Sequence, residues 1–220
     1  MKNIPRLFIN DDLSVEKVID IPKEQLHYLT RVMRTNECLV FNNGLEFSAV
    51  IENNKLKIIK NTGRADPSNN LIFAFAPIKQ SRMEEMLNAA TQLGVAVLQP
   101  VITEFTTEKF PKCNRAEKII IESAEQSGRN SIPNLLPPMK FSDFIKNKNI
   151  VFADERFTRN NIIQDEIKIT PNYIFVGPAG GFSDSEFDAL DKSGATAISL
   201  GRTILRSETA AIVAISRFVL

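Results

Sequence analysis

Three short segments of this chain combine glycine with polar or charged side chains in a way that could bind a ligand. They are residues 125–130 (EQSGRN), 177–181 (GPAGG) and 200–210 (LGRTILRSETA). Glycine lets a ligand approach the backbone closely, and free N–H groups at the start of a helix bind an anion or a carboxylate. Residues 177–181 match neither a P-loop nor a dinucleotide fingerprint. They predict either a ligand-binding loop or simply a tight turn between a strand and a helix.

The segment 200–210 places charged side chains around apolar loop residues. Arg206 and Glu208 lie where a loop is expected to pass into the last helix. Glu208 alone could merely complement the helix dipole, and Arg206 alone could be a solvated loop residue. Because two arginines and a glutamate occur together there, opposite a glycine-rich loop, the segment favours a functional site.

The segment 125–130 presents Arg129 and Asn130 directly after Gly128, the expected C-cap of a helix over residues 115–127. An arginine near the C-terminus of a helix is favourable on dipole grounds alone. The functional alternative is that Arg129 contacts a phosphate or a base.

The single histidine, His27, is followed by Arg31 and Arg34 at helical spacing. These three residues predict a basic stripe suited to an RNA backbone. His27 has no evident partner for catalysis or for metal binding. The two cysteines, Cys38 and Cys113, fit neither a disulfide framework nor a zinc spacing, so no metal site is predicted. Cys38 is expected in the core and Cys113 at the surface.

Composition sets wide limits on the class of protein. The chain has 220 residues, of which 43% are hydrophobic and 24% charged, with a net charge of +1. Charge is balanced on both sides of residue 70, so a nonspecific polyanion binder is not indicated. The N-terminus lacks the apolar core of a signal peptide, and the apolar stretch 71–78 is too short to span a bilayer. The sequence predicts a cytoplasmic protein without a membrane partner.

The elements that must position these residues fall into two parts. Strand-like runs occupy residues 6–9, 18–21, 37–41, 45–51 and 55–60. Asn43-Gly44 is a strong hairpin signal, and a helix is expected over residues 23–33. Within 45–51, apolar residues alternate with Glu46, Ser48 and Val50, as in a half-buried strand. Short strands with tight turns favour a small closed barrel over residues 1–68, and the polar run 61–70 predicts a linker.

The spacing of apolar residues is different in residues 71–220. Continuous apolar runs typical of buried parallel strands cover residues 71–76, 95–101, 149–153, 173–177 and 196–200. Helical stretches lie between most of them, which predicts an α/β domain. Ser81 with Glu84 and Ser183 with Glu186 are both read as capping boxes that begin helices.

Taken together, the three segments resemble the SPOUT methyltransferases, and within them the type that methylates N3 of a uridine in 16S ribosomal RNA. Residues 27–34 (HYLTRVMR), 79–82 (KQSR) and 99–104 (QPVITE) extend the likeness over essentially the whole chain. The resemblance implies an α/β SPOUT domain with a trefoil knot at about residues 149–210, preceded by a PUA-like RNA-binding β-barrel. It also implies S-adenosylmethionine as cofactor, a homodimer, and a substrate within the assembled small ribosomal subunit.

The resemblance further implies roles for individual residues. Those expected to bind the cofactor are Glu155, Gly177, Pro178, Gly180, Gly181, Ser199, Leu200, Gly201, Ile204, Leu205 and Thr209. Those expected to bind RNA are His27, Arg31, Arg34, Lys79, Arg82, Gln126, Arg129 and Asn130. Arg129 and Arg206 are candidates to stabilise charge on the target base, and Glu208 is the candidate proton acceptor.

The chain departs from the family pattern at two positions. Ala179 stands where glutamate is typical, and Thr203 stands where arginine is common. These departures motivate a rival interpretation, in which the chain is a noncatalytic RNA-binding protein of ribosome assembly with the same fold. A second rival is a methyltransferase that acts on another RNA, such as tRNA, or on a small molecule.

Overall fold

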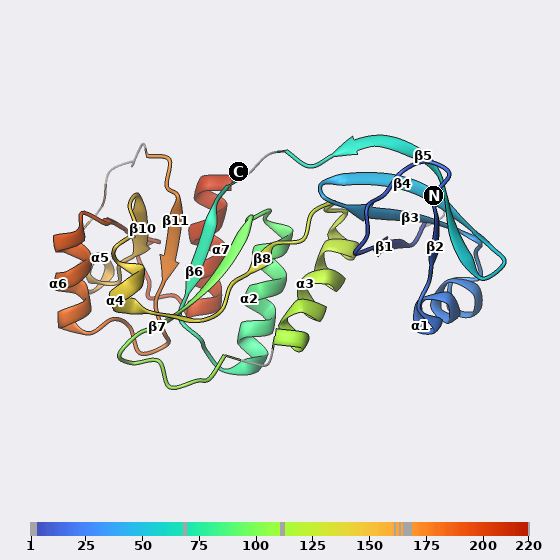
Figure 1. Ribbon diagram of the computed structural model, residues 1–220. Helices are drawn as coiled ribbons and strands as arrows, with labels where there is room; N and C mark the ends of the chain where they lie inside the picture. The colour runs from blue at the N-terminus through green and yellow to red at the C-terminus, as the bar shows by residue number, and fades with distance from the viewer. Residues whose placement is uncertain are drawn as a thin grey trace. The chain divides into compact units, whose positions relative to one another are not determined.

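The chain divides into two compact units (Figure 1). The computed structural model describes residues 4–67, 70–110, 113–160, 162, 164 and 169–219, without the side chain of Cys113, so the expectation for that side chain lies outside the described residues. The first unit comprises Met1–Ser68 and Ile121–Ile132, and the second comprises Asn69–Ile120 and Pro133–Leu220. Residues 121–132 were assigned by sequence to the second domain. They group with the first because their polar contacts, described below, are made there.

The first unit contains a five-stranded sheet in the order β1-β3-β4-β5-β2. Its strands are β1 (Arg6–Phe8), β2 (Val18–Asp20), β3 (Glu37–Asn42), β4 (Leu45–Glu52) and β5 (Lys55–Ala65). β1 pairs in parallel with β3, whereas the other neighbours are antiparallel. The expected strands are therefore present, but among the described residues the hydrogen-bonded order has two edges, β1 and β2. It is an open sheet and not the closed barrel that the short strands favoured.

Two turns with left-handed backbone join the central strands. Asn43 and Gly44 have φ of 50° and 78° between β3 and β4, as the hairpin signal predicted. Asn53 and Asn54 have φ of 51° and 61° between β4 and β5. Asparagine and glycine tolerate this region best, so both turns have the residues that their geometry requires.

The helix of the first unit is irregular. α1 (Lys23–His27) continues into a π-helical turn, η1 (Tyr28–Val32), where Met33 N–H donates to the Tyr28 carbonyl at 2.9 Å. Arg34 lies beyond its end with φ of 52°. The predicted basic stripe of His27, Arg31 and Arg34 required one regular helix. Because the turn widens and the helix ends before Arg34, the three basic residues do not follow that single helical face.

A separate core fills the first unit. Its buried members are Leu7, Ile9, Ile19, Leu29, Cys38, Val40, Phe47, Ala49, Leu56 and Ile58. Burial raises the pKa of the Cys38 thiol to about 12, as expected for a core cysteine. The alternation within β4 holds only in part, because Leu45 is exposed and Glu46 is 3% exposed. Glu46 is buried because it pairs with Arg6, at 3.0 Å.

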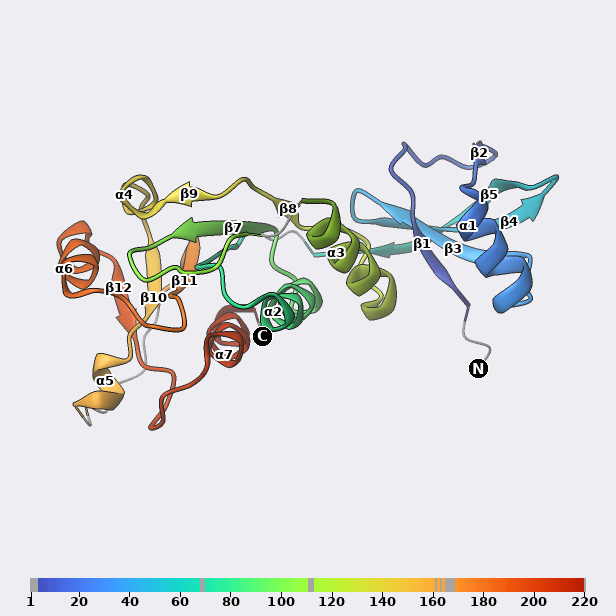
Figure 2. The ribbon, with the colours of Figure 1, turned by 90° about the horizontal axis from the view of Figure 1, so that it is seen from below.

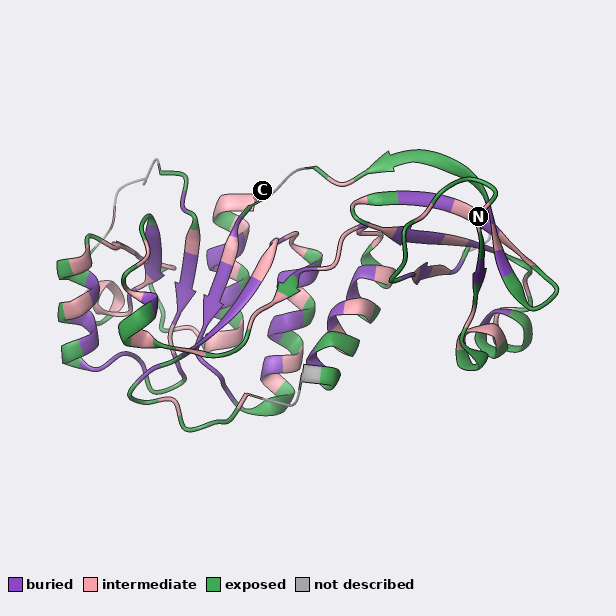
Figure 3. Ribbon diagram, viewed as in Figure 1, coloured by how far each residue is buried: buried purple, intermediate pink, exposed green. Residues whose placement is uncertain are grey.

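The polar run after residue 60 is strand rather than linker up to Ala65. β5 keeps its pairing with β4 there, with Asn61 opposite Phe47 and Ala65 opposite Leu45, across two register shifts. This end of β5 is exposed (Figure 3). Its polar composition therefore reflects a solvated edge of the sheet and not a break in secondary structure.

The second unit is built on a parallel sheet in the order β12-β10-β11-β6-β7-β8, with β9 paired to β7. Its strands are β6 (Ile72–Phe75), β7 (Val97–Ile102), β8 (Asn134–Leu135), β9 (Met139–Lys140), β10 (Ile150–Ala153), β11 (Tyr173–Val176) and β12 (Thr196–Ile198). The five strands predicted from continuous apolar runs are all present. Four of them, β6, β7, β10 and β11, are largely buried on both faces, which is why their sequences do not alternate, whereas β12 at the edge is only partly buried.

Helices cover both faces of this sheet. They are α2 (Gln80–Gln92), α4 (Phe141–Phe144), α5 (Arg156–Arg159), α6 (Asp184–Ser193) and α7 (Ser207–Val219), whereas α3 (Cys113–Ser127) is divided between the two units after Ile120. α2 and α7 lie on one face and α4 on the other (Figure 2). Phe144 of α4 and Phe187 of α6 share an apolar cluster with Phe152 and Phe175 of the sheet. Among the described residues, no helix has the length and apolar character needed to cross a membrane.

Three predictions of helix caps can be compared with the observed ends of the helices. α6 begins with the predicted capping box of Ser183 and Glu186. α3 ends at Gly128, whose φ of 80° supplies the left-handed C-cap. The predicted capping box of Ser81 and Glu84 is wrong, because the N-cap of α2 is Lys79, two residues before Ser81. Glu84 instead accepts hydrogen bonds from Gln80 and Arg115.

Candidate ligand site

A cavity of about 300 Å³ opens in the second unit where strands β10, β11 and β12 end. Loops after parallel strands converge at the same edge of a sheet, which is where open α/β folds bind ligands. The residues expected to bind a cofactor that line this cavity are Glu155, Gly177, Pro178, Gly180, Gly181, Leu200, Ile204 and Leu205. Ser199, Gly201 and Thr209 are not among the lining residues, whereas Arg206 is. Two segments about 20 residues apart in the sequence thus form one wall.

The glycine loop after β11 has no room for side chains at two positions. A Cβ atom at Gly181, where φ is 80°, would lie 2.6 Å from Oε1 of Glu155. A Cβ atom at Gly177 would lie 2.8 Å from the ring of Phe182. The glycines therefore serve close packing and a left-handed turn within the cavity wall, as well as leaving backbone exposed to a ligand.

The loop after β12 supplies the apolar part of the wall. Ile204 is 60% exposed and lines the cavity. The loop is held by Thr158, whose hydroxyl donates to the Gly201 carbonyl at 3.0 Å. Ser199 N–H donates to the Gln164 side chain at 2.7 Å. The contribution of Ser199 and Gly201 is therefore to fix the loop that presents Leu200, Ile204 and Leu205.

The end of β10 carries acidic residues of which sequence reasoning identified only one. Asp154 is 5% exposed and accepts from Arg156, including Nη2 at 2.7 Å. Arg156 also bonds Asp191 of α6, and its hydrogen bonds to both carboxylates raise the pKa of the guanidinium. Glu155 bonds Arg159 at 2.8 Å. Asp154 could have been found from the sequence, because it is an acidic residue directly after a buried strand.

A second cavity, of about 360 Å³, adjoins the first. Both are lined by Arg82, Pro178, Ala179, Gly180 and Ser207. Lys79 and Glu208 line the second cavity only. Glu208 is largely buried, and its Oε1 lies 3.7 Å from Nε of Arg82. The structure therefore brings together Lys79, Arg82 and Glu208, which sequence reasoning had placed in two different roles.

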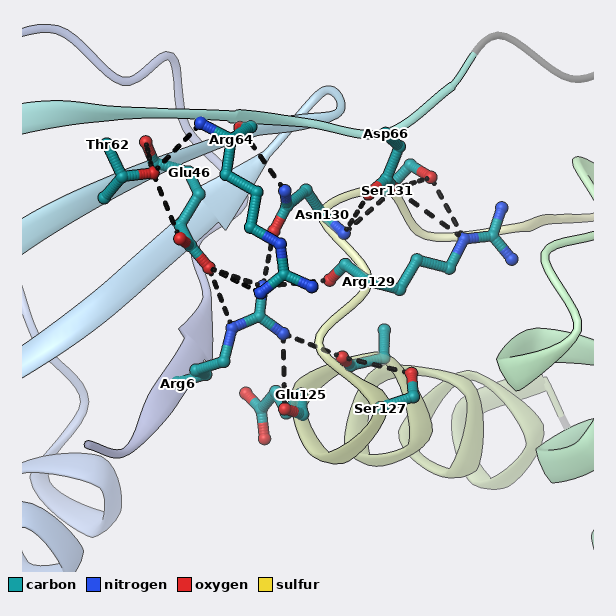
Figure 4. A network of polar contacts seen from close by, with 11 residues as sticks. Arg6, Glu46, Thr62, Arg64, Asp66, Glu125, Ser127, Arg129, Asn130 and Ser131 are labelled. Carbon is teal, nitrogen blue, oxygen red and sulfur yellow. Dashed lines mark hydrogen bonds and ion pairs between the residues drawn. The ribbon is translucent and has the colours of Figure 1, made fainter. Parts of the chain in front are cut away.

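The segment 125–130 belongs to the first unit and is held there by a polar network (Figure 4). Asn130 is fully buried, and its N–H donates to both oxygens of Asp66, at 3.0 and 2.9 Å. Its side-chain oxygen accepts from Arg6, which also bonds Glu46. Asn130 is thereby committed to contacts inside the protein, which is a different environment from the exposed RNA contact expected of it.

Arg129 takes part in the same network. Its Nε donates to Ser131 Oγ at 3.0 Å and lies 4.0 Å from Asp66, while Ser131 donates to Asp66 at 2.7 Å. Its side chain is 11% exposed, and burial lowers the pKa of the guanidinium. Arg129, Asn130 and Gln126 do not line either cavity of the second unit.

The three basic residues that the sequence placed on one stripe are solvent-facing. His27, Arg31 and Arg34 are all exposed, as an RNA-contacting surface requires. No group of three or more metal-ligating side chains occurs within the described part of the chain.

Comparisons with known proteins agree on one family. Residues 65–219 match the profile of the RNA methyltransferase domain. The chain is 33% identical to the ribosomal RNA small subunit methyltransferase E of Mesomycoplasma hyopneumoniae, over 94% of this chain and 95% of that protein. It is 32% identical to the protein of the same name from Rickettsia conorii, over 96% and 93%. The structure resembles that of the Neisseria gonorrhoeae ribosomal RNA small subunit methyltransferase E bound to S-adenosyl methionine, with a TM-score of 0.85, 26% identity, and coverage of 98% and 96%.

Proposed function

The chain belongs to the RNA methyltransferase domain family, among proteins named ribosomal RNA small subunit methyltransferase E, and from that premise we propose that it transfers a methyl group from S-adenosylmethionine to N3 of a uridine in 16S ribosomal RNA. The observation that carries this proposal is the cavity at the ends of β10, β11 and β12. Its walls come from the two segments that resembled the family's cofactor loops.

The residues of the first cavity fit S-adenosylmethionine. Leu200, Ile204 and Leu205 offer an apolar surface for a purine ring, and the glycine loop offers backbone groups without side chains in the way. Glu155 supplies negative charge near a ligand that carries a sulfonium and an ammonium group. When bound, the cofactor supplies a methyl group activated by its positively charged sulfur.

The protein must also activate the acceptor. N3 of uracil carries a proton, and its electron pair becomes available for the new N–C bond only when that proton leaves. We assign Glu208 as the proton acceptor, because it is the most buried of the three glutamates that line the second cavity, whereas Glu104 and Glu108 are exposed. As the proton leaves, charge develops on the flanking carbonyl oxygens, and we assign the stabilisation of that charge to Arg206, which lines the cofactor cavity. For Arg129 we retain a role in holding the RNA, through the loop that Asp66 and Ser131 fix.

The architecture of each unit and the partners of the chain are part of the same proposal. We propose that the first unit is a PUA-like RNA-binding domain and that the chain forms a trefoil knot over about residues 149–210. The contact from Thr158 to Gly201 supports the knot, because it brings the loop after β10 against the loop after β12. We further propose a homodimer that acts on the assembled small subunit in the cytoplasm.

The test of the function is the nucleoside content of 16S ribosomal RNA from a strain in which the gene is deleted. We expect 3-methyluridine to be missing and to be restored by the wild-type gene. The purified protein should also methylate small subunits from the deletion strain in the presence of S-adenosylmethionine. Unchanged 3-methyluridine in 16S RNA, with a modification lost from tRNA, would favour the methyltransferase of another RNA.

The departures at Ala179 and Thr203 keep one rival open, a noncatalytic assembly protein. Both residues line the first cavity. Calorimetry separates the two proposals, because the enzyme must bind S-adenosylmethionine. An absence of heat at millimolar cofactor would favour the noncatalytic protein.

The first unit provides a prediction about RNA affinity. Replacing Arg31 and Arg34 together with glutamate should weaken binding to 16S RNA and flatten its dependence on salt, because fewer phosphate contacts release fewer counterions. We expect a loss of at least about tenfold at low salt, measured by filter binding over a series of salt concentrations.

Cofactor affinity, measured on the same preparations, serves as the control and should not change. Wild-type RNA affinity in the double variant would mean that these exposed arginines form only a solvated surface.

A further inference from the structure

The second cavity of the second unit lies beside the cavity assigned to the cofactor, and this position suits it to hold the acceptor. It adjoins the first cavity along the backbone of Pro178, Ala179 and Gly180. A methyl donor in one cavity and an acceptor in the other would therefore be separated only by that loop. Positioning of two reactants side by side is the main contribution that an enzyme makes to such a transfer.

Phe105 gives this cavity an exposed aromatic face. It lies in the loop after β7, lines the cavity, and is 45% exposed. It is close to the wall that the two cavities share, because a Cβ atom at Gly180 would lie 3.4 Å from Phe105 Cβ. An exposed phenylalanine that lines such a cavity is a surface on which a base can stack.

The loop that carries Phe105 is held on both sides of it. Glu104 N–H donates to Oε1 of Glu186 at 2.8 Å, and Glu186 is the buried residue that also caps α6. Thr103 N–H donates to Thr106 Oγ1 at 3.0 Å, and the two hydroxyls are 2.7 Å apart. The aromatic ring is thus presented to solvent by a backbone that is itself anchored, so that little ordering is needed when a ligand stacks on it.

The polar groups of the cavity match one edge of uracil. That edge carries an N–H donor between two carbonyl acceptors. Glu208, the most buried of the three glutamates of the cavity, provides an acceptor for the N–H. Lys79 and Arg82 provide donors for the carbonyl oxygens, alongside Arg206 of the adjoining cavity. Cytosine presents an acceptor at N3 and an amino group beside it, so it would place its N3 lone pair against the carboxylate.

We propose that the second cavity receives the target uracil, unstacked from its neighbours in the RNA, with Phe105 as the face on which the base stacks and Glu208 as the group that distinguishes uracil from cytosine. This assignment rests on the proposed methylation of uridine. It adds a residue, Phe105, that neither the sequence motifs nor the cofactor cavity identify.

The test uses binding of a fluorinated nucleotide, which needs no turnover. 5-Fluorouridine monophosphate is titrated into the full-length protein and followed by ¹⁹F NMR, since an aromatic ring stacked on the base shifts the fluorine signal. We expect Phe105→Ala to weaken binding by about tenfold or more and to abolish the ring-dependent shift, whereas Phe105→Tyr retains both. 5-Fluorocytidine monophosphate should bind the wild-type protein at least about tenfold more weakly.

Ile212→Ala is the matched control, because Ile212 is an exposed apolar residue of α7 that lines neither cavity. Calorimetry with S-adenosylmethionine should give wild-type affinity for every variant. Nucleotide binding that is absent from the wild-type protein, or unchanged by Phe105→Ala, would overturn the assignment even if the wild-type protein methylates 16S RNA. Phe105-dependent binding of the nucleotide without methylation of 16S RNA would instead contradict the proposed function.

Discussion

Replacing Gly181 with valine should weaken binding of S-adenosylmethionine by at least about 100-fold, which corresponds to roughly 2.7 kcal/mol. Two effects act in the same direction. Gly181 has φ of 80°, a region that costs a β-branched residue roughly 1–2 kcal/mol or more, and its Cβ would lie 2.6 Å from Glu155 Oε1. Relief of that contact must move either the glycine loop or Glu155, and both line the cofactor cavity. Isothermal titration calorimetry measures the loss directly.

A matched variant separates strain from blockage. Gly194 has nearly the same φ, 79°, but a Cβ there meets nothing within 4 Å, and Gly194 ends α6 outside the cavity. Gly194→Val should therefore lower the melting temperature to a similar degree while cofactor affinity stays within about threefold. If Gly181→Val remains folded and binds the cofactor as the wild type does, the cofactor site is not in this cavity.

The strands and the local signals of this fold were accessible from the sequence. Continuous apolar runs marked β6, β7, β10, β11 and β12, and in the first four of these strands the reason is burial on both faces, which leaves few polar positions. Asn43-Gly44 and the pair of Ser183 with Glu186 are local signals, decided by the conformation of a few adjacent residues. Such features depend little on the rest of the chain, and the structure confirms them.

Apart from the basic stripe, which the local π-helical turn interrupts, the predictions that were wrong have a common physical cause, which is a contact with a residue distant in the sequence. Glu46 is buried against the alternation of its strand because Arg6 pairs with it from another strand, 40 residues earlier. The segment 61–65 is strand because β4 pairs with it, and Glu84 is drawn from a capping role by Arg115. The segment around Asn130 was predicted to be exposed. Asn130 instead makes an internal contact, because its N–H donates to Asp66.

The cavities were only partly accessible for the same reason. The glycine loop and the segment 200–210 were recognised, since their composition is unusual for a turn. Periodicity cannot give the order of strands, so it could not place Phe105 of the loop after β7 beside Glu208 at the start of α7. A phenylalanine in the otherwise polar stretch after Ile102 was the available signal.

Replacing Glu208 with glutamine should lower the single-turnover rate of methylation by at least about 100-fold, the usual range for loss of a positioned proton acceptor. Glutamine keeps the shape of the side chain but cannot take the N3 proton. Affinity for the cofactor should stay within about threefold, because Glu208 does not line the cofactor cavity. The measurement is the rate with enzyme in excess over undermethylated small subunits, across a series of pH values.

The pH series distinguishes a proton acceptor from a residue that merely supports Arg82. Hydroxide can remove the N3 proton when the carboxylate is absent, so the rate of Glu208→Gln should rise with pH and approach that of the wild type. Glu84→Gln is the matched control, because Glu84 also pairs with an arginine, Arg115 at 2.7 Å, yet lines neither cavity. It should methylate at the wild-type rate. The rate of Glu208→Gln could instead be reduced by the same factor at every pH, and Arg82→Gln could show the same reduction. That result would mean that Glu208 only holds Arg82 in position, and the N3 proton would have to leave by another route.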